Sequence, residues 1–303
     1  MIKKSLSAFI LLICIFSCKK EAQKTSEGKI EKDTVSKIEE KEEDLFKPID
    51  TVCTSKNKTE DYIAALQWYQ QKTEKEIARN SPEQNDKLYE DYIKIRDKYT
   101  ACLSESLSKV LVEYVNYYDS ESDSYKFPEN IKELSTQLKK GSLEFTEVGE
   151  GYTEIWSLPD HYFSLFKGKV TPDYNSYIEQ LSKESEGLYS ADAGLVISWK
   201  DLGERTIFWE NFIKRYPKSS LVSRAKEMYS DYLYDYLFGM DNTPTHEHSD
   251  GTIYDENREE FNRIIKKYPN SNVAKKSKEL MDLFDAKIPE EEIHKRINIE
   301  REY

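Results

Sequence analysis

Two copies of a short motif decide the fold of this 303-residue chain. The stretch IKRYPKS at residues 213–219 recurs as IKKYPNS at residues 265–271, 52 residues later, with five of seven positions identical. In both copies basic residues precede the Tyr-Pro pair, where they suit the negative pole at the end of a helix. Pro then stops that helix, and Ser can cap the next one. The motif therefore predicts two units, each an amphipathic helix, a turn and a second helix.

The likeness between the units extends beyond the motif to apolar residues at helical spacing. The aligned pairs are Trp209/Phe261, Phe212/Ile264, Met228/Leu280 and Tyr232/Phe284. With the motif residues Tyr216, Pro217, Ser219, Tyr268, Pro269 and Ser271, this pattern resembles the tetratricopeptide-like repeats of bacterial envelope lipoproteins, including the helical lipoprotein of the outer-membrane-protein assembly machinery. The resemblance covers about residues 207–283 and implies stacked helix pairs without catalytic residues. The 52-residue spacing exceeds the usual repeat of about 34 residues, and a long second helix with a loop at 239–251 explains the excess.

The N-terminus has the features of a secretion signal. Lys3 and Lys4 precede an apolar run at residues 9–16. As a helix this run would span about 12 Å, far less than the roughly 30 Å of a bilayer core. It is therefore predicted to be a targeting segment and not a transmembrane helix.

The signal ends in IFSC at residues 15–18, which resembles the lipobox of bacterial lipoproteins. The resemblance implies that Cys18 becomes the N-terminus and carries acyl chains such as palmitate, which anchor a protein to a membrane. Cys14 is a poor rival because a bulky Ile precedes it, and an ordinary signal peptide cut elsewhere is the alternative. Lys19, in place of an Asp retention signal, favours the outer membrane, with the periplasmic or surface face left open.

The segment that follows is too charged to form a core. Residues 19–50 contain 18 charged side chains out of 32. We therefore predict a signal peptide at 1–17 and a disordered tether at 18–50. A flexible chain of this length would hold the body about 30 Å from its anchor. A short charged helix around residues 35–46 is the alternative.

Amphipathic helices are predicted from about residue 51. One runs over 58–79, and NSPEQ at 80–84 then provides an N-cap, a helix-start Pro and a capping box for a second, long helix. These helices form an antiparallel hairpin, predicted as the region 51–140. Cys53 and Cys102 lie about one helical turn from ideal register across it, so a disulfide is predicted for an oxidising compartment. Two independent buried thiols are the alternative.

The remaining residues, 141–303, are predicted to hold one β-hairpin and the helix pairs. Residues 143–156 alternate loosely around a VGEG turn, which indicates the two strands. Helical periodicity then resumes at 159–166 and 172–185. The fold class is thus mainly α, a helical hairpin followed by helix pairs with one small β-hairpin, and 51–303 is also compatible with one continuous domain.

The sequence shows few signs of chemistry. With 57 acidic against 45 basic residues, the chain lacks the basic balance of a nucleic-acid binder. No phosphate loop, nucleophile elbow or HExxH motif occurs, so neither catalysis nor a cofactor is predicted. HEHSD at 246–250 could supply metal ligands but is interpreted as a solvated loop, and no metal is predicted. His161 is expected beside a capping Asp160 at a helix start.

Tyrosine-rich stretches leave a second function open. Tyr114, Tyr117 and Tyr118 form one cluster, and a second comprises Tyr229, Tyr232, Tyr234 and Tyr236. Aromatic platforms bind sugars, although this helical spacing is also typical of packing. The sequence therefore predicts a lipid-anchored envelope scaffold for a protein or peptide partner, with a glycan- or small-ligand-binding lipoprotein as the alternative.

Overall fold

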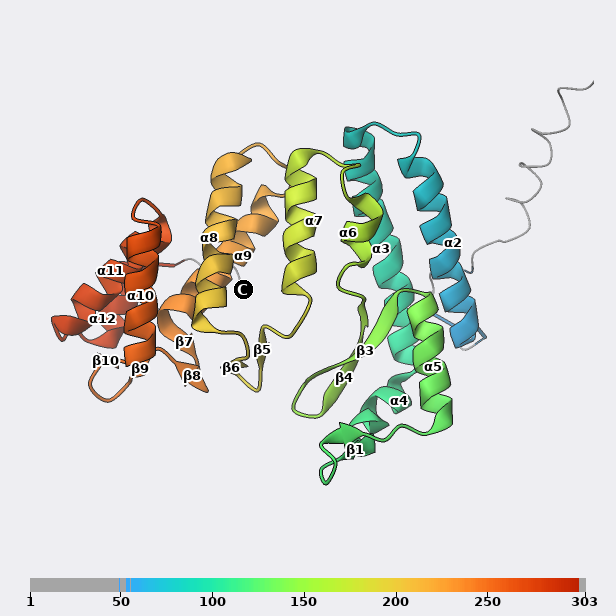
Figure 1. Ribbon diagram of the computed structural model, residues 1–303, viewed down its shortest axis with the longest axis horizontal. Coiled ribbons are helices and arrows are strands. Elements are labelled where there is room, and N and C mark those ends of the chain that lie inside the picture. Colours follow the sequence, from blue (N-terminus) through green and yellow to red (C-terminus); the bar gives the residue numbers. More distant parts are fainter. Residues whose placement is uncertain (1–48, 50–52, 55, 300–303) are drawn as a thin grey trace, which may run out of the picture. The chain divides into compact units, whose positions relative to one another are not determined.

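The computed structural model describes Ile49, residues 53–54 and residues 56–299 (Figure 1). The chain divides into two units, residues 1–47 and 48–303, and every described residue belongs to the second. The predicted signal peptide, Cys18 and nearly all of the predicted tether therefore lie outside the described residues. Over the described part the predicted mainly α fold is confirmed.

The helical hairpin is formed by α2 (Thr59–Ile77) and α3 (Pro82–Ser106), which pack side by side (Figure 1). The predicted capping box is present: Ser81 Oγ accepts from Gln84 N, and Gln84 Oε1 accepts from Ser81 N. The predicted second, long helix ends at Ser106. There the chain forms the short α4 (Ser108–Glu113) and the 3-10 helix η1 (Tyr114–Tyr117).

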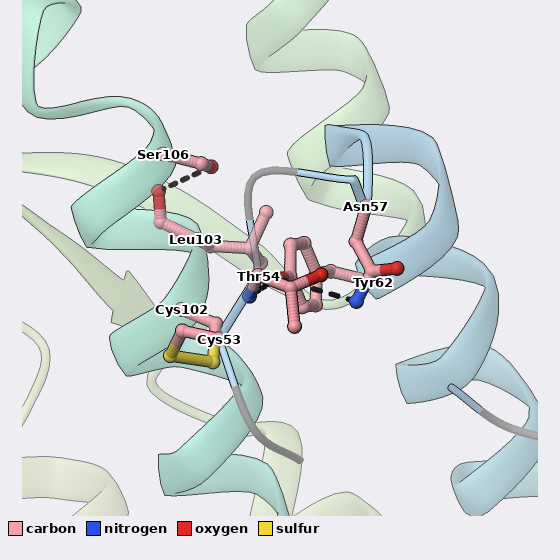
Figure 2. The surroundings of a disulfide bond; sticks show 7 residues. All are labelled: Cys53, Thr54, Asn57, Tyr62, Cys102, Leu103 and Ser106. Carbon is pink, nitrogen blue, oxygen red and sulfur yellow. Dashed lines mark hydrogen bonds between the residues drawn. A yellow bond between two sulfur atoms is a disulfide. The ribbon is translucent and has the colours of Figure 1, made fainter. Parts of the chain in front are cut away.

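The predicted disulfide joins Cys53 to Cys102, with the two Cα atoms 5.0 Å apart (Figure 2). Cys102 is buried in α3, whereas Cys53 is exposed and precedes the first turn of α2. Beside it, Tyr62 Oη accepts hydrogen bonds from Thr54 N and Asn57 Nδ2 (Figure 2). The bond thus fastens the chain entering α2 to the partner helix of the hairpin.

The predicted β-hairpin is also confirmed. It consists of β3 (Leu143–Gly149) and β4 (Tyr152–Ser157), antiparallel with Phe145 opposite Ile155. Before it come the ladder of β1 (Tyr118–Asp119) with β2 (Ser124–Tyr125) and the helix α5 (Glu129–Lys140). Leu143 and Ile155 share a core with buried residues of α2 and α3. Two strands are marginal alone, and this core supports them.

Arg96 of α3 ties the same hairpin to the helices. Its side chain is buried and donates to the carbonyl oxygens of Gly141 and Ser142, at 2.8 and 2.6 Å, and to Ser157 Oγ at 2.9 Å. These acceptors lie where the chain enters β3 and where it leaves β4, at the open end of the β-hairpin. A buried guanidinium needs such partners because its desolvation is costly.

The second core includes α6 (His161–Phe166) and α7 (Pro172–Glu184) and continues through the C-terminal helices. Tyr89 of α3 meets both α6 and α7: its ring packs edge-on against Phe166 and Tyr174. The connection between α7 and the next helix contains the ladder of β5 (Ser190–Ala191) with β6 (Gly194–Leu195). Because α3 contributes to both cores, the hairpin and the C-terminal helices are joined through it.

Two helix pairs follow: α8 (Trp199–Arg215) packs on α9 (Val222–Phe238), and α10 (Asp255–Lys267) packs on α11 (Asn272–Asp285). The aligned residues Trp209 and Phe261 are both fully buried. Helix α12 (Glu290–Ile297) packs on α11. The loop between the pairs carries two further ladders, β7 (Gly239–Met240) with β8 (Thr243–Pro244) and β9 (His246–Glu247) with β10 (Thr252–Ile253).

No helix among the described residues has both the length and the apolar composition needed to span a membrane.

The disulfide generates a stability prediction. Replacing both partners, Cys53→Ser with Cys102→Ser, should lower the free energy of unfolding by up to about 4 kcal/mol in the chain-entropy account of a loop of about 50 residues. Urea unfolding of the oxidised wild type and the variant measures the difference. Reductant should destabilise the wild type by a similar amount and leave the variant unchanged. Equal midpoints for oxidised and reduced wild type would contradict the prediction.

Candidate functional site

The first helices of the two pairs, α8 and α10, form with α7 one face of the C-terminal region, which we call the first-helix face (Figure 1). It carries two cavities. The first, about 590 Å³, lies between α7 and α8 and is lined by residues that include Lys183, Arg205, Phe208 and Tyr268. The second, about 580 Å³, lies between the start of α8 and α10 and includes Trp199 and Lys200.

An ion-pair network separates the two cavities. Glu204 lines the first and Arg263 lines the second, with Arg263 Nη1 2.6 Å from Glu204 Oε1. Glu204 also accepts from Lys267 Nζ at 2.9 Å and from Tyr268 Oη at 2.5 Å. Burial alone would raise the pKa of Glu204, but the hydrogen bonds from Tyr268, Lys267 and Arg263 outweigh it and lower this pKa to about 2. The network therefore links α8 to the end of α10 with an ionised carboxylate.

A second carboxylate joins the pairs behind this face. Glu210 of α8 is almost fully buried, and it accepts from the backbone N of Asn272 at 2.7 Å and of Val273 at 3.1 Å. These are the first two residues of α11, whose leading N–H groups have no partner within the helix. Lys214 also contacts Glu210. One helix pair thus caps a helix of the next.

The repeat motif residues occupy equivalent places at the ends of α8 and α10. Tyr216 and Tyr268 have nearly the same backbone conformation, with φ −123° and −130° and ψ 54° and 55°. Ser271 caps α11, since its Oγ accepts from Ala274 N at 3.0 Å. The expectation that Ser219 caps α9 is wrong: its Oγ accepts from Leu221 N, and α9 begins at Val222. Pro217 and Pro269 lie in the turns between the helices.

The second tyrosine cluster is used largely in packing. Tyr232 and Tyr236 are buried, and their hydroxyls donate to Glu184 and Glu260. In the first cluster, the Tyr114 ring lies among Tyr125, Phe127 and Phe145, and Tyr118 is 45% exposed. The glycan-binding alternative remains a prediction.

His161 is buried at the start of α6, and its Nε2 lies 2.8 Å from Tyr92 Oη. Burial, helped by the charge of Arg96, lowers the pKa of His161 to about 3. Asp160 precedes the helix as expected, but its side chain makes no capping hydrogen bond and instead accepts from Ser164 Oγ. The ring is therefore a neutral partner of Tyr92 within the core.

The other three histidines, His246, His248 and His294, lie around one carboxylate, Glu290. The interpretation of 246–250 as a solvated loop holds for His248 but is wrong for His246, which is 1% exposed. No local pattern in the sequence indicates this cluster, because Glu290 lies 42 residues after His248. No spacing rule connects positions so far apart.

Comparisons with known protein families, with curated proteins and with solved structures give no match for this chain.

The Glu204 network generates a pH prediction. The folded-state pKa, about 2, lies below the ordinary 4.5, so the ionised carboxylate stabilises the fold above pH 4.5. This stability is lost as the pH falls from 4.5 towards 2. In Glu204→Gln, the loss of unfolding free energy over that range should be smaller than in the wild type. Chemical denaturation at a series of pH values measures it.

Glu186→Gln is the matched control, because it makes the same chemical change at an exposed side chain of the same cavity. It should follow the wild type. Identical acid profiles for Glu204→Gln and the wild type would show that the network contributes no pH-dependent stability.

Proposed function

We propose that this chain is a lipid-anchored lipoprotein of the bacterial cell envelope, of the outer-membrane type, that holds a protein or peptide partner on its first-helix face and catalyses no reaction. The observation that carries the binding role is the pair of cavities on α7, α8 and α10, on either side of the Glu204–Arg263 ion pair. The proposal includes the tetratricopeptide-like nature of the two helix pairs.

The chemistry of this face suits a peptide. The cavity between α7 and α8 combines the partly buried ring of Phe208 with charged groups of both signs, among them Lys183 and Asp201. Apolar contacts favour binding through burial, while polar groups around them set orientation and specificity. A peptide with an apolar anchor and flanking charges fits this combination.

Two observations support the proposed location in the cell envelope. The IFSC sequence at 15–18 follows an apolar run of signal-peptide length. The Cys53–Cys102 disulfide fits an oxidising compartment outside the cytoplasm. Acyl chains on Cys18 would then provide the membrane attachment.

The anchor is tested by fractionating cells that express Cys18→Ala. This variant should leave the membrane pellet for the soluble fraction, because it lacks the thiol that carries the acyl chains. Cys14→Ala is the matched control, since it removes a neighbouring cysteine of the same segment and should stay in the pellet. Cys18→Ala protein that remains membrane-bound would refute the lipid anchor.

The partner is tested by photocrosslinking in intact bacteria, with the crosslinking residue placed at Asn211 or Lys200, one for each cavity. The same residue at Lys275, exposed on α11, is the control. A partner captured from the two cavity positions and not from Lys275 is the expected result. Equal capture at all three positions, or no captured protein, would contradict the scaffold role. Saturable quenching of Trp fluorescence by soluble glycans would then support the alternative.

A further inference from the structure

A group of potential metal ligands lies away from the first-helix face, where the loop between the helix pairs meets the last helix. His246 belongs to β9, His248 follows it directly, and Glu290 is the first residue of α12 (Figure 1). The ligand atoms of these three side chains all lie within 4.8 Å of one another. Two segments far apart in sequence thus bring two imidazoles and a carboxylate together.

Two separations between these side chains are close to those between donors around a tetrahedral zinc ion. Glu290 Oε1 lies 3.2 Å from His246 Nε2, and Glu290 Oε2 lies 3.3 Å from His248 Nδ1. Two donors bound to one tetrahedral Zn²⁺ at about 2.0–2.1 Å stand roughly 3.3 Å apart. The side chain of His248 is 63% exposed, so its ring can rotate to complete the set.

The buried ring of His246 supplies an independent observation that points to a cation-binding site. Thr245 Oγ1 donates to Leu237 O at 2.8 Å, so at 3.2 Å it can only accept a hydrogen bond from His246 Nδ1. A neutral ring that is protonated at Nδ1 has a bare lone pair on Nε2. Among the described residues this buried Nε2 has no hydrogen-bond partner, yet it lies beside the carboxylate of Glu290. Two acceptors face each other, and a cation between them would satisfy both.

The residues around these three side chains hold the His246 ring in place and leave the group open to an ion. Thr245 fixes the orientation of the His246 ring, which is the role that outer partners of metal-binding histidines usually have. Phe284 packs on the same ring, with centroids 4.4 Å apart. Glu290 and His248 line a cavity of about 540 Å³, which gives an ion a route to the site. His294, one turn along α12, has its Nε2 3.6 Å from Glu290 Oε1 and is a further nitrogen ligand close to the group.

We propose that His246, His248 and Glu290 form a binding site for a divalent transition-metal ion of the zinc type, with His294 or water in the fourth position. Two imidazoles and one carboxylate suit zinc and its neighbours, whereas Ca²⁺ and Mg²⁺ require mostly oxygen ligands. The bound ion would join the loop before α10 to α12. This site departs from the sequence prediction of no metal and does not depend on the proposed function.

The test is calorimetric titration of the purified, metal-stripped full-length protein with Zn²⁺, with native mass spectrometry for stoichiometry. The wild type should bind one equivalent. Glu290→Gln and His248→Gln should each bind at least about tenfold more weakly, since even outer partners of metal ligands affect affinity by this much. His248 is chosen over buried His246 because its exposed ring can be replaced without disturbing the core. Mg²⁺ and Ca²⁺ should give no comparable binding.

Glu291→Gln is the matched control, because it makes the same change one residue along, at a side chain that is 85% exposed and paired with Lys295. It should bind zinc like the wild type. Circular dichroism confirms that each variant is folded. If the folded wild type binds no zinc, the proposal is overturned, and the Nε2 lone pair of His246 is filled by a proton. Equal affinity in the wild type, Glu290→Gln and His248→Gln would also overturn it, because the zinc would then be held elsewhere.

Discussion

The buried carboxylate of Glu210 accepts from two backbone N–H groups at the start of α11, so one helix pair supplies the cap for a helix of the other. A carboxylate in this position is stabilised by the positive pole of the helix and by the N–H groups that the helix leaves unpaired. Separating the two pairs without admitting water would take both backbone donors from the buried carboxylate and leave it only the contact with Lys214, which is unfavourable. The contact therefore fixes where α10 and α11 lie relative to α8.

A second buried carboxylate joins the preceding helix, α7, to the first helix pair. Glu184, at the end of α7, accepts from Trp209 Nε1 and from Tyr232 Oη, each at 3.0 Å. Burial raises the pKa of Glu184 despite these hydrogen bonds. Buried carboxylates thus fasten α7 to the first helix pair and the first pair to the second. The large aromatic residues around them supply the apolar contact area, and the carboxylates specify which surfaces meet.

Local patterns were enough to predict the long helices and the larger β-hairpin of this fold. Apolar spacing, the Ser81–Gln84 capping box and the repeated Tyr-Pro motif are properties of short stretches, and the helices they predict are present. The disulfide could be predicted because the hairpin register brings Cys53 and Cys102 close. Ser219 failed as a cap because the turn before α9 runs two residues longer than its counterpart before α11. The cluster of Glu290 with the histidines could not be predicted, since it forms only when α12 packs back on α11 and the β9–β10 loop.

The position of the disulfide has a mechanical consequence. Cys53 precedes α2, and its bond leads directly to Cys102 in the last turns of α3, which ends at Ser106. A pulling force applied to the chain before Cys53 would therefore be borne by a covalent bond to α3, and the hydrogen bonds of α2 would stay outside the loaded path. Without that bond, the same force would enter at Thr59 and peel α2 away turn by turn.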